Sequence, residues 1–321
     1  MPSADTAERR ASALDFTRLP NLRQETPAAA ATGPSRPVAL RSITVLGDLS
    51  DASEVALQRA AALAGAHDAS LKLVAWAGRG DVSHGLLRAR LSRIGRRVAR
   101  QHQRPILMAE TPLRRVGEAR DVLRHTDLVV VPKTLHAGLA SFWRPSVASR
   151  LASVLPVPLL VVNEPCGLAY QRVLAGVDLQ AEPERLVHWA LALAGEREVA
   201  LLHVLRQWRP SKLRTGHDGL RTLELDLRRR VTQFERVVDA QGPQAERLRM
   251  MLALGDDVAA ELLARRPGAG SQLIVVGRST EAPWLDALLG SVTRSVLRAS
   301  PYDVLVVPVS SALMAAAQGE A

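Results

Sequence analysis

The chain of 321 residues is poor in cysteine and contains no long apolar run. Cys166 is the single cysteine, which excludes an intramolecular disulfide framework and fits a reducing compartment. No apolar run reaches the roughly 18 residues that a membrane helix needs. The longest such run, residues 151–162, is interrupted by Pro156 and Pro158. We therefore expect a soluble protein with no membrane segment.

Signatures of common enzyme sites are absent as well. The sequence holds no Walker motif, no GxGxxG after a strand and no GxSxG elbow. The eight histidines are scattered without metal-ligand spacing. His203, on an expected strand, is interpreted as a core residue with its hydrogen bonds satisfied. The sequence therefore names no catalytic and no metal-binding residue.

Acidic residues are missing from one stretch of a chain whose formal net charge is +10. Between Asp81 and Glu110 leucine, isoleucine and valine recur at helical spacing, which predicts an amphipathic helix with an arginine-rich outer face. Such a face suits an acidic partner, although a solvated surface is the simpler interpretation. Aromatic residues make up 3% of the chain and are not interleaved with the arginines, which disfavours nucleic acid. The arginines are Arg88, Arg90, Arg93, Arg96, Arg97, Arg100 and Arg104.

What is present is an alternation of short apolar strands with helical patterns. In the first half, strands are expected at residues 42–46, 71–76, 106–108, 128–131 and 159–162. Strands that alternate with helices predict a parallel, doubly wound α/β sheet. Residues 1–37, without a sustained apolar period, are interpreted as a disordered N-terminal tail. Residues 311–321 are interpreted as a C-terminal tail.

The second half repeats this plan. An offset of 130 aligns Asp48 with Asp178, and an offset of 145 aligns Ser146 with Ser291. The difference indicates an insertion, which we place at residues 208–239. With 47% hydrophobic content the chain can bury about two cores. We predict two tandem doubly wound, Rossmann-like domains, 38–165 and 169–310, each an open parallel five-stranded sheet.

One stretch of the second half carries the candidate site. Residues 273–276 predict a buried strand, a loop opens at Gly277, a helix covers residues 291–299, and a last strand covers residues 304–307. The start of a helix offers free N–H groups to an anion such as phosphate. Gly290 allows close approach of the backbone, and Ser291 and Thr293 add hydroxyl groups. An ordinary strand-loop-helix crossover explains the same pattern equally well.

The spacing Gly277, two residues, Thr280, nine residues, Gly290-Ser291 resembles the nucleotide motif of the universal stress protein family, here in a tandem two-domain arrangement. The resemblance implies a cytoplasmic stress-response regulator that binds ATP, with or without Mg²⁺, and hydrolyses it little or not at all. Asp178 would contact the adenosine part, although it suits a turn or helix cap equally. Val204 would line the base pocket. The remaining implied residues are Val276, Gly277, Ser279, Thr280, Gly290, Ser291, Val292 and Thr293.

Two features depart from the motif of the ATP-binding members. Thr280 stands at the position of their middle glycine, and Glu281 adds a negative charge beside it. If the loop requires a left-handed backbone at Thr280, the cost is roughly 1–2 kcal/mol. In the first half Pro132, Leu135 and Pro145 stand at the positions of Gly277, Thr280 and Gly290. Proline has no N–H to donate, so we expect a degenerate loop there.

Several alternatives remain open at this stage. Lys133, His136 and Arg144 could still attract an anion to the first half. The resemblance also implies self-association through the last strands, residues 159–162 and 304–307, within the chain or between chains. An interaction or dimerisation protein that binds no nucleotide is the second hypothesis. An ATP-consuming enzyme is the third.

Overall fold

The structure, a computed structural model, describes residues 13–14, 38–78, 84–135, 146–163, 169–205, 217–265, 272–280 and 289–310. In its first half (β2 to β6 and α1 to α4) strands and helices alternate as the sequence predicts. The elements are β2 (Ser42–Gly47), α1 (Asp51–His67), β3 (Ser70–Ala75), α2 (His84–His102), β4 (Ile106–Met108), α3 (Val116–Leu123), β5 (Leu128–Pro132), α4 (Val147–Val154) and β6 (Leu159–Val162).

The second half (β7 to β11 and α5 to α8) follows the same order, with a short 3-10 helix added before β9. Its elements are β7 (Arg172–Gly176), α5 (Pro183–Ala194), β8 (Val199–Leu205), α6 (His217–Asp239), η6 (Gly242–Arg247), β9 (Leu248–Leu254), α7 (Val258–Ala264), β10 (Gln272–Ser279), α8 (Ser291–Ala299) and β11 (Asp303–Val309). The helix α6 has 23 residues, against 19 in its counterpart α2.

The strands of the described residues belong to one sheet, in the order β1-β9-β8-β7-β10-β11-β6-β5-β2-β3-β4. Each half contributes five parallel strands, which confirms the predicted α/β fold class. The two halves meet where β11 pairs with β6 in antiparallel register, Leu305 opposite Leu160. The last strands therefore pair with each other within the chain. Because they run in opposite directions, the carboxyl ends of the two sets of strands lie at opposite edges of the sheet.

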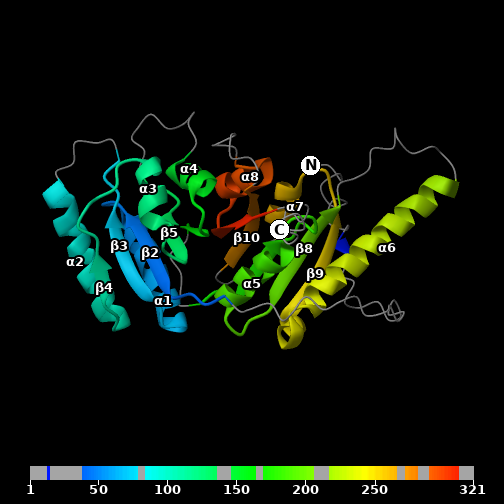
Figure 1. Ribbon diagram of the computed structural model, residues 1–321, viewed down its shortest axis with the longest axis horizontal. Helices are drawn as coiled ribbons and strands as arrows, with labels where there is room; N and C mark the ends of the chain where they lie inside the picture. Colours follow the sequence, from blue (N-terminus) through cyan, green and yellow to red (C-terminus); the bar gives the residue numbers. More distant parts are fainter. Residues whose placement is uncertain are drawn as a thin grey trace, which may run out of the picture.

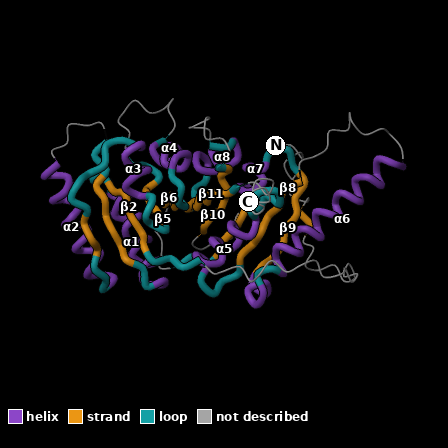
Figure 2. The backbone as a smooth tube through the Cα atoms, viewed as in Figure 1, coloured by secondary structure: helices purple, strands orange, loops and turns teal. Residues whose placement is uncertain are grey.

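Helices cover both faces of this sheet (Figure 1). Along each strand, buried side chains alternate between two apolar clusters, and each cluster extends through both halves. One cluster includes residues of α1, α2, α5 and α6, and the other includes residues of α3, α4, α7 and α8. Figure 2 shows the strands running through the middle of the elongated molecule, with α2 at one end and α6 at the other.

The N-terminal segment contributes one element that the sequence did not predict. Residues Ala13–Leu14 form β1, which pairs antiparallel with Leu252 and Ala253 of β9. The expectation of a disordered tail is therefore wrong for these two residues, because the outer edge of β9 offers unpaired backbone groups. The other residues of the tail, and the C-terminal tail, lie outside the described residues.

A buried polar network joins the two halves beside the antiparallel pair. The carboxylate of Asp303, at the start of β11, lies 3.1 Å from Arg59 Nε of α1 and accepts a hydrogen bond of 2.7 Å from the Tyr170 hydroxyl. The Arg59 guanidinium stacks 4.2 Å above the Tyr170 ring, and Asn163 N donates to Asp303 at 2.8 Å. Burial, with the negative charge of Asp303, raises the pKa of Tyr170 well above its usual value.

Two cations cross the same junction in equivalent positions. Arg278 donates to the carbonyls of Ser153 and Leu155 at the end of α4, at 3.3 and 2.8 Å. Lys133 donates to the carbonyl of Ser300 at the end of α8, at 2.5 Å. Lys133 and Arg278, like Leu155 and Ser300, are aligned by the offset of 145 in the sequence. Each half thus places a cation on the negative end of a helix of the other half.

Candidate functional site

The candidate residues lie at the carboxyl edge of the second half. The strands β8, β7 and β10 are neighbours in the sheet and run parallel, so their carboxyl ends meet at one edge. This places Val204, Asp178 and Ser279 at the same edge, and the helix α8 begins at Gly290 nearby in the chain. Ligands of doubly wound sheets bind at such an edge.

The helix α8 begins without a side-chain cap. Gly290 is its N-cap residue, with φ −51° and ψ 149°, and as a glycine it supplies no side-chain cap. A Cβ built on Gly290 would meet no atom of the described residues beyond its chain neighbours within 4 Å, and Ser291 is exposed. Val292 is partly buried. The first N–H groups of α8 have no intrahelical acceptor, so this terminus has the features of an anion site.

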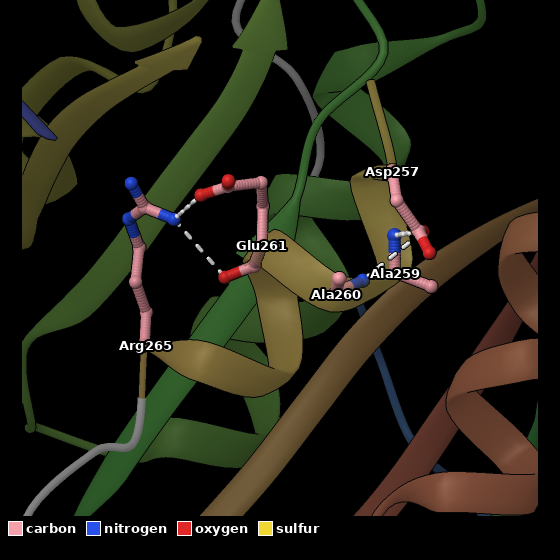
Figure 3. Close-up of polar contacts among 5 residues, drawn as sticks. All are labelled: Asp257, Ala259, Ala260, Glu261 and Arg265. Atoms are coloured by element: carbon pink, nitrogen blue, oxygen red, sulfur yellow. Dashed lines mark hydrogen bonds and ion pairs between the residues drawn. The ribbon is translucent and has the colours of Figure 1, made fainter. Parts of the chain in front are cut away.

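The neighbouring helix α7, by contrast, has a side-chain N-cap. Asp257 Oδ1 accepts hydrogen bonds from Ala259 N and Ala260 N, at 2.9 and 3.1 Å (Figure 3). One turn later Glu261 forms an ion pair with Arg265 on the same helix. The N-cap role of Asp257 was not predicted, although an Asp before an apolar helical run is a recognisable signal. Of these two helix starts, that of α7 has a side-chain cap and that of α8 has none.

The strand β10 continues further than the sequence suggests. We predicted a loop from Gly277 onward, but β10 extends to Ser279 because it pairs with β11 over seven residues, with Gly277 opposite Val307. A Cβ on Gly277 would lie 3.1 Å from Val309 and 3.5 Å from Leu186 of α5. Gly277 therefore permits close packing toward α5, on the face where Val275 is also buried.

Thr280 extends the pairing beyond β10. Its N–H donates to the carbonyl of Val309 at 3.0 Å, and its hydroxyl lies 3.3 Å from the same oxygen. Its φ is not positive, so the expected cost of a left-handed backbone does not arise. The exposed Thr280 therefore has its N–H occupied by the sheet. Glu281 lies outside the described residues.

Thr293 links the start of α8 to the sheet. Its side chain is 3% exposed, and its hydroxyl donates to the carbonyl of Gly277 at 2.9 Å. Of the two predicted hydroxyl donors, Thr293 is therefore structural in this structure, whereas Ser291 is exposed at the helix start. Val276 and Val204 are buried on the face of α7 and α8, 2% and 9% exposed.

Asp178 follows β7 and is exposed. Its Oδ1 accepts a hydrogen bond of 3.0 Å from Gln180 N, so the carboxylate also shapes the turn into α5. At the end of that turn Glu182 has φ +37° and accepts a hydrogen bond of 3.0 Å from Ser310 N. Glu182 thereby ties the start of α5 to the end of β11, a contact that the sequence analysis missed.

His203 is buried with only one of its two ring nitrogens hydrogen-bonded within the described part of the chain. Its Nδ1 lies 2.8 Å from the carbonyl of Val177, but its buried Nε2 has no partner among the described residues. Burial lowers the pKa of His203 below its usual value of 6.5. The interpretation of His203 as a fully satisfied core residue is therefore wrong.

The corresponding edge of the first half is filled with apolar side chains. Trp76, Leu113 and Leu135 are each at most 5% exposed and belong to one cluster, with Leu135 at the position of Thr280. Asp48, the counterpart of Asp178, is 7% exposed and accepts hydrogen bonds from Ser53 Oγ at 2.8 Å, Ser50 N at 2.9 Å and the Ser50 hydroxyl. Pro132 is buried in β5, and His136, Arg144 and Pro145 lie outside the described residues.

Lys133, one of the cations considered for an anion in the first half, contacts the second half. Its ammonium group is held by the carbonyl of Ser300, and burial lowers its pKa below the usual value. No cluster of three or more His, Cys, Asp or Glu suited to a metal ion is found in the part of the chain that the structure describes. Within the same residues, no helix is both long and apolar enough to cross a membrane.

Comparison with known proteins adds a family to this geometry. The model of the universal stress protein family matches residues 169–308. A universal stress protein from Archaeoglobus fulgidus DSM 4304 has a similar structure, with TM-score 0.60 and 16% identity over 84% of this chain and 99% of that chain. A functionally unknown protein from Pseudomonas aeruginosa PAO1 gives 0.58 and 17% over 84% and 93%. At these identities the structural similarities show the fold.

A further similar structure is a universal stress protein in complex with cAMP. It matches 39% of this chain and 98% of its own, with 20% identity and TM-score 0.32. No curated protein sequence matches the chain.

Proposed function

We propose, from the premise that residues 169–308 form a domain of the universal stress protein family, that this domain binds an adenine nucleotide, ATP, as a stress-response regulator. The observation that carries the proposal is the start of α8, which has no side-chain cap: a Cβ on Gly290 would meet no described residue within 4 Å, and Thr293 ties this helix start to Gly277 of β10. The phosphates would meet the N–H groups of residues 291–293 and the Ser291 hydroxyl.

The nucleoside would then lie toward the ends of β7 and β8. There Asp178 offers an exposed carboxylate to ribose hydroxyls, and Val204 offers apolar surface to the base. The start of α8 would be positioned by β10, because the Thr293 hydroxyl donates a hydrogen bond to the carbonyl of Gly277 beside Val276. Mg²⁺ would arrive on the phosphates, as it often does. Without a catalytic residue to name, we expect phosphate release at the background rate.

Gly290→Ala tests this placement of the phosphates. The backbone angles of Gly290 suit any residue, and a methyl group there would meet none of the described residues within 4 Å, so the fold should persist. The methyl group would project into the proposed phosphate site. Gly117→Ala, in the first turn of α3, is the matched control, because a Cβ there also meets nothing within 4 Å.

Isothermal titration of nucleotide-free protein with ATP and Mg²⁺ reads the result. We expect the parent and Gly117→Ala to bind equally and Gly290→Ala to bind at least about tenfold more weakly, which is 1.4 kcal/mol. Thermal unfolding is the second readout, since ATP at 100 times its Kd should add about 2.7 kcal/mol. If the nucleotide-free parent shows neither heat nor a thermal shift, the proposal fails and the non-nucleotide interaction protein takes its place.

We also propose an acidic partner for the outer face of α2. Five arginines on this helix are exposed, and no carboxylate among the described residues pairs with them. Arg97 and Arg104 are partnered by Glu54 and Asp68. The five are Arg88, Arg90, Arg93, Arg96 and Arg100. A labelled polyglutamate peptide should bind the parent at low salt and lose affinity in the Arg93→Glu, Arg96→Glu variant, whereas equal binding would refute this face.

A further inference from the structure

The loop between β7 and α5, which carries Asp178, is contacted by His203 of the neighbouring strand β8. His203 lies on β8, is 6% exposed, and its Nδ1 is 2.8 Å from the carbonyl oxygen of Val177. Because a carbonyl oxygen only accepts, Nδ1 carries the proton of the neutral ring. His203 therefore donates to the residue immediately before Asp178. At the equivalent position of the first half stands Leu73, which cannot make this bond.

The helix α6 makes a second contact with the same loop. Gln233 Nε2 donates to the carbonyl of Leu179 at 2.6 Å. With His203 on Val177, the two donors bracket Asp178, one on the carbonyl before it and one on the carbonyl after it. The loop also depends on its own turn, in which Ala181 N donates to Asp178 O at 3.2 Å. The bracket thus adds two contacts from outside the loop, one of which comes from α6.

The helix α6 also encloses the His203 ring. Phe234 of α6 lies edge-on to the ring at 6.3 Å between centroids and is 1% exposed. The buried Nε2 finds no partner among the described residues. In the neutral ring Nε2 is an acceptor, which costs little more than one lost hydrogen bond, but a proton there would place an uncompensated charge beneath α6.

We propose that α6 is a pH-sensitive brace of the β7–α5 loop: Gln233 and His203 fix the carbonyls on either side of Asp178, and protonation of His203 releases both α6 and the loop. The inference rests on the proposed function for its consequence, because Asp178 is there assigned to the nucleoside. The brace itself is defined without any nucleotide. Acid would therefore weaken the site by loosening the residue that positions the ligand.

Burial decides the direction in which the pKa of His203 moves. Burial has the largest effect and lowers the pKa of His203, and the bond to Val177, which comes next, raises it. Of the two charged neighbours, Arg230 on α6 lowers this pKa and the exposed Asp178 raises it. Those are the charged groups that act on the ring from α6 and from the loop; β9 presents Leu252 opposite His203. Since the pKa is below 6.5 in the folded state, the brace is intact above pH 6.5 and weakens as the pH falls below it.

Hydrogen exchange of the nucleotide-free full chain at pH 7.5 and pH 5.0 tests the brace, after correction for intrinsic exchange. We expect residues 177–182 and 227–239 of the parent to lose protection together at pH 5.0, by up to about 30-fold, the linkage limit for a group with an unfolded pKa of 6.5. His203→Asn keeps a donor for Val177 but does not titrate, and its protection should not respond to pH. Gln233→Met should expose the loop at both pH values.

Two results would overturn the proposal: protection of α6 and the loop that is unchanged at pH 5.0 in the parent, or the same acid response in His203→Asn. The pKa values of His67 and His188 are also lowered by burial, and both residues are intact in that variant. If His203→Asn does not fold, ¹⁵N shifts of the parent ring decide. A closed-state ring that is mostly neutral at pH 6.5, together with the loss of protection by pH 5.0, supports the brace, and a ring that is already mostly charged at pH 6.5 refutes it.

Because these measurements are made without nucleotide, they test the brace independently of the proposed function. If α6 and the loop respond to pH but the protein binds no ATP, the brace stands and the proposed nucleotide-binding function fails. ATP binding that is equal at pH 7.5 and 5.0, with an intact acid response of α6, would show that Asp178 does not position the nucleoside.

Discussion

The two carboxyl edges of the sheet carry equivalent residues in opposite environments. Asp48 is buried and its carboxylate accepts hydrogen bonds from Ser50 and Ser53, whereas its counterpart Asp178 is exposed and its carboxylate accepts one from Gln180 N. Leu135 is buried beside Trp76, whereas its counterpart Thr280 is exposed. A repeated fold therefore does not imply a repeated site. At the edge of the first half, Asp48 and Leu135 are buried and stabilise the fold. At the edge of the second half, Asp178 and Thr280 are accessible to solvent.

The largest effect is expected where the halves share one network. Asp303→Ala removes the acceptor of Arg59, Tyr170 and Asn163 and leaves a buried guanidinium without its carboxylate. We expect a loss of about 3–5 kcal/mol in unfolding free energy, measured in urea. Glu54→Ala, which breaks the exposed pair with Arg97, is the control and should cost less than about 1 kcal/mol. Equal losses would show that the junction is not a stabilising core.

The two crossing cations should differ in the same measurement. Arg278 holds two carbonyls at the end of α4, and Lys133 holds one at the end of α8. Arg278→Ala should therefore cost about 2–3 kcal/mol and Lys133→Ala about 1–2 kcal/mol. An equal cost, or a larger one for Lys133, would contradict the geometric difference between the two sides of the junction.

The same substitution at the two equivalent aspartates tests the comparison directly. Asp48→Asn removes the charge of a buried carboxylate whose Oδ1 accepts three hydrogen bonds and should cost about 1–2 kcal/mol in stability. Asp178→Asn is exposed and should change stability by less than about 0.5 kcal/mol. Its effect should appear in ATP affinity, measured by titration. The reverse pattern would mean that Asp178 is the structural residue.

The sequence predicted the sheet well because both halves are built from short apolar strands between amphipathic helices. It did not predict that β10 passes through Gly277, because glycine after a strand normally signals a turn. Here the missing side chain makes room for Val309 and Leu186 instead. The resemblance implied pairing of the last strands, but it left open whether β6 pairs with β11 of the same chain, since an apolar edge strand has the same pattern whether its partner lies within the chain or in another.

Polar residues at the junction and beneath α6 were the hardest to interpret from sequence. Arg59 lies among alanines and leucines on α1, a position that predicts burial and hence a buried partner, but the sequence does not identify Asp303, 244 residues away. His203 on an apolar strand was rightly placed in the core. Its single hydrogen bond became visible only once Val177 and Phe234 were positioned around it. Long-range polar pairs leave no local periodicity to read.

The central claim is that one edge is open to a nucleotide and the other is closed. Photoaffinity labelling of the nucleotide-free protein with an azido-ATP, followed by peptide mapping, tests it most directly. We predict ATP-competable label on peptides of the second half that contain residues 177–182, 203–205 or 289–293, and none around Trp76 or Leu135. Label on the first half, or equal label on both, would contradict the difference between the two edges.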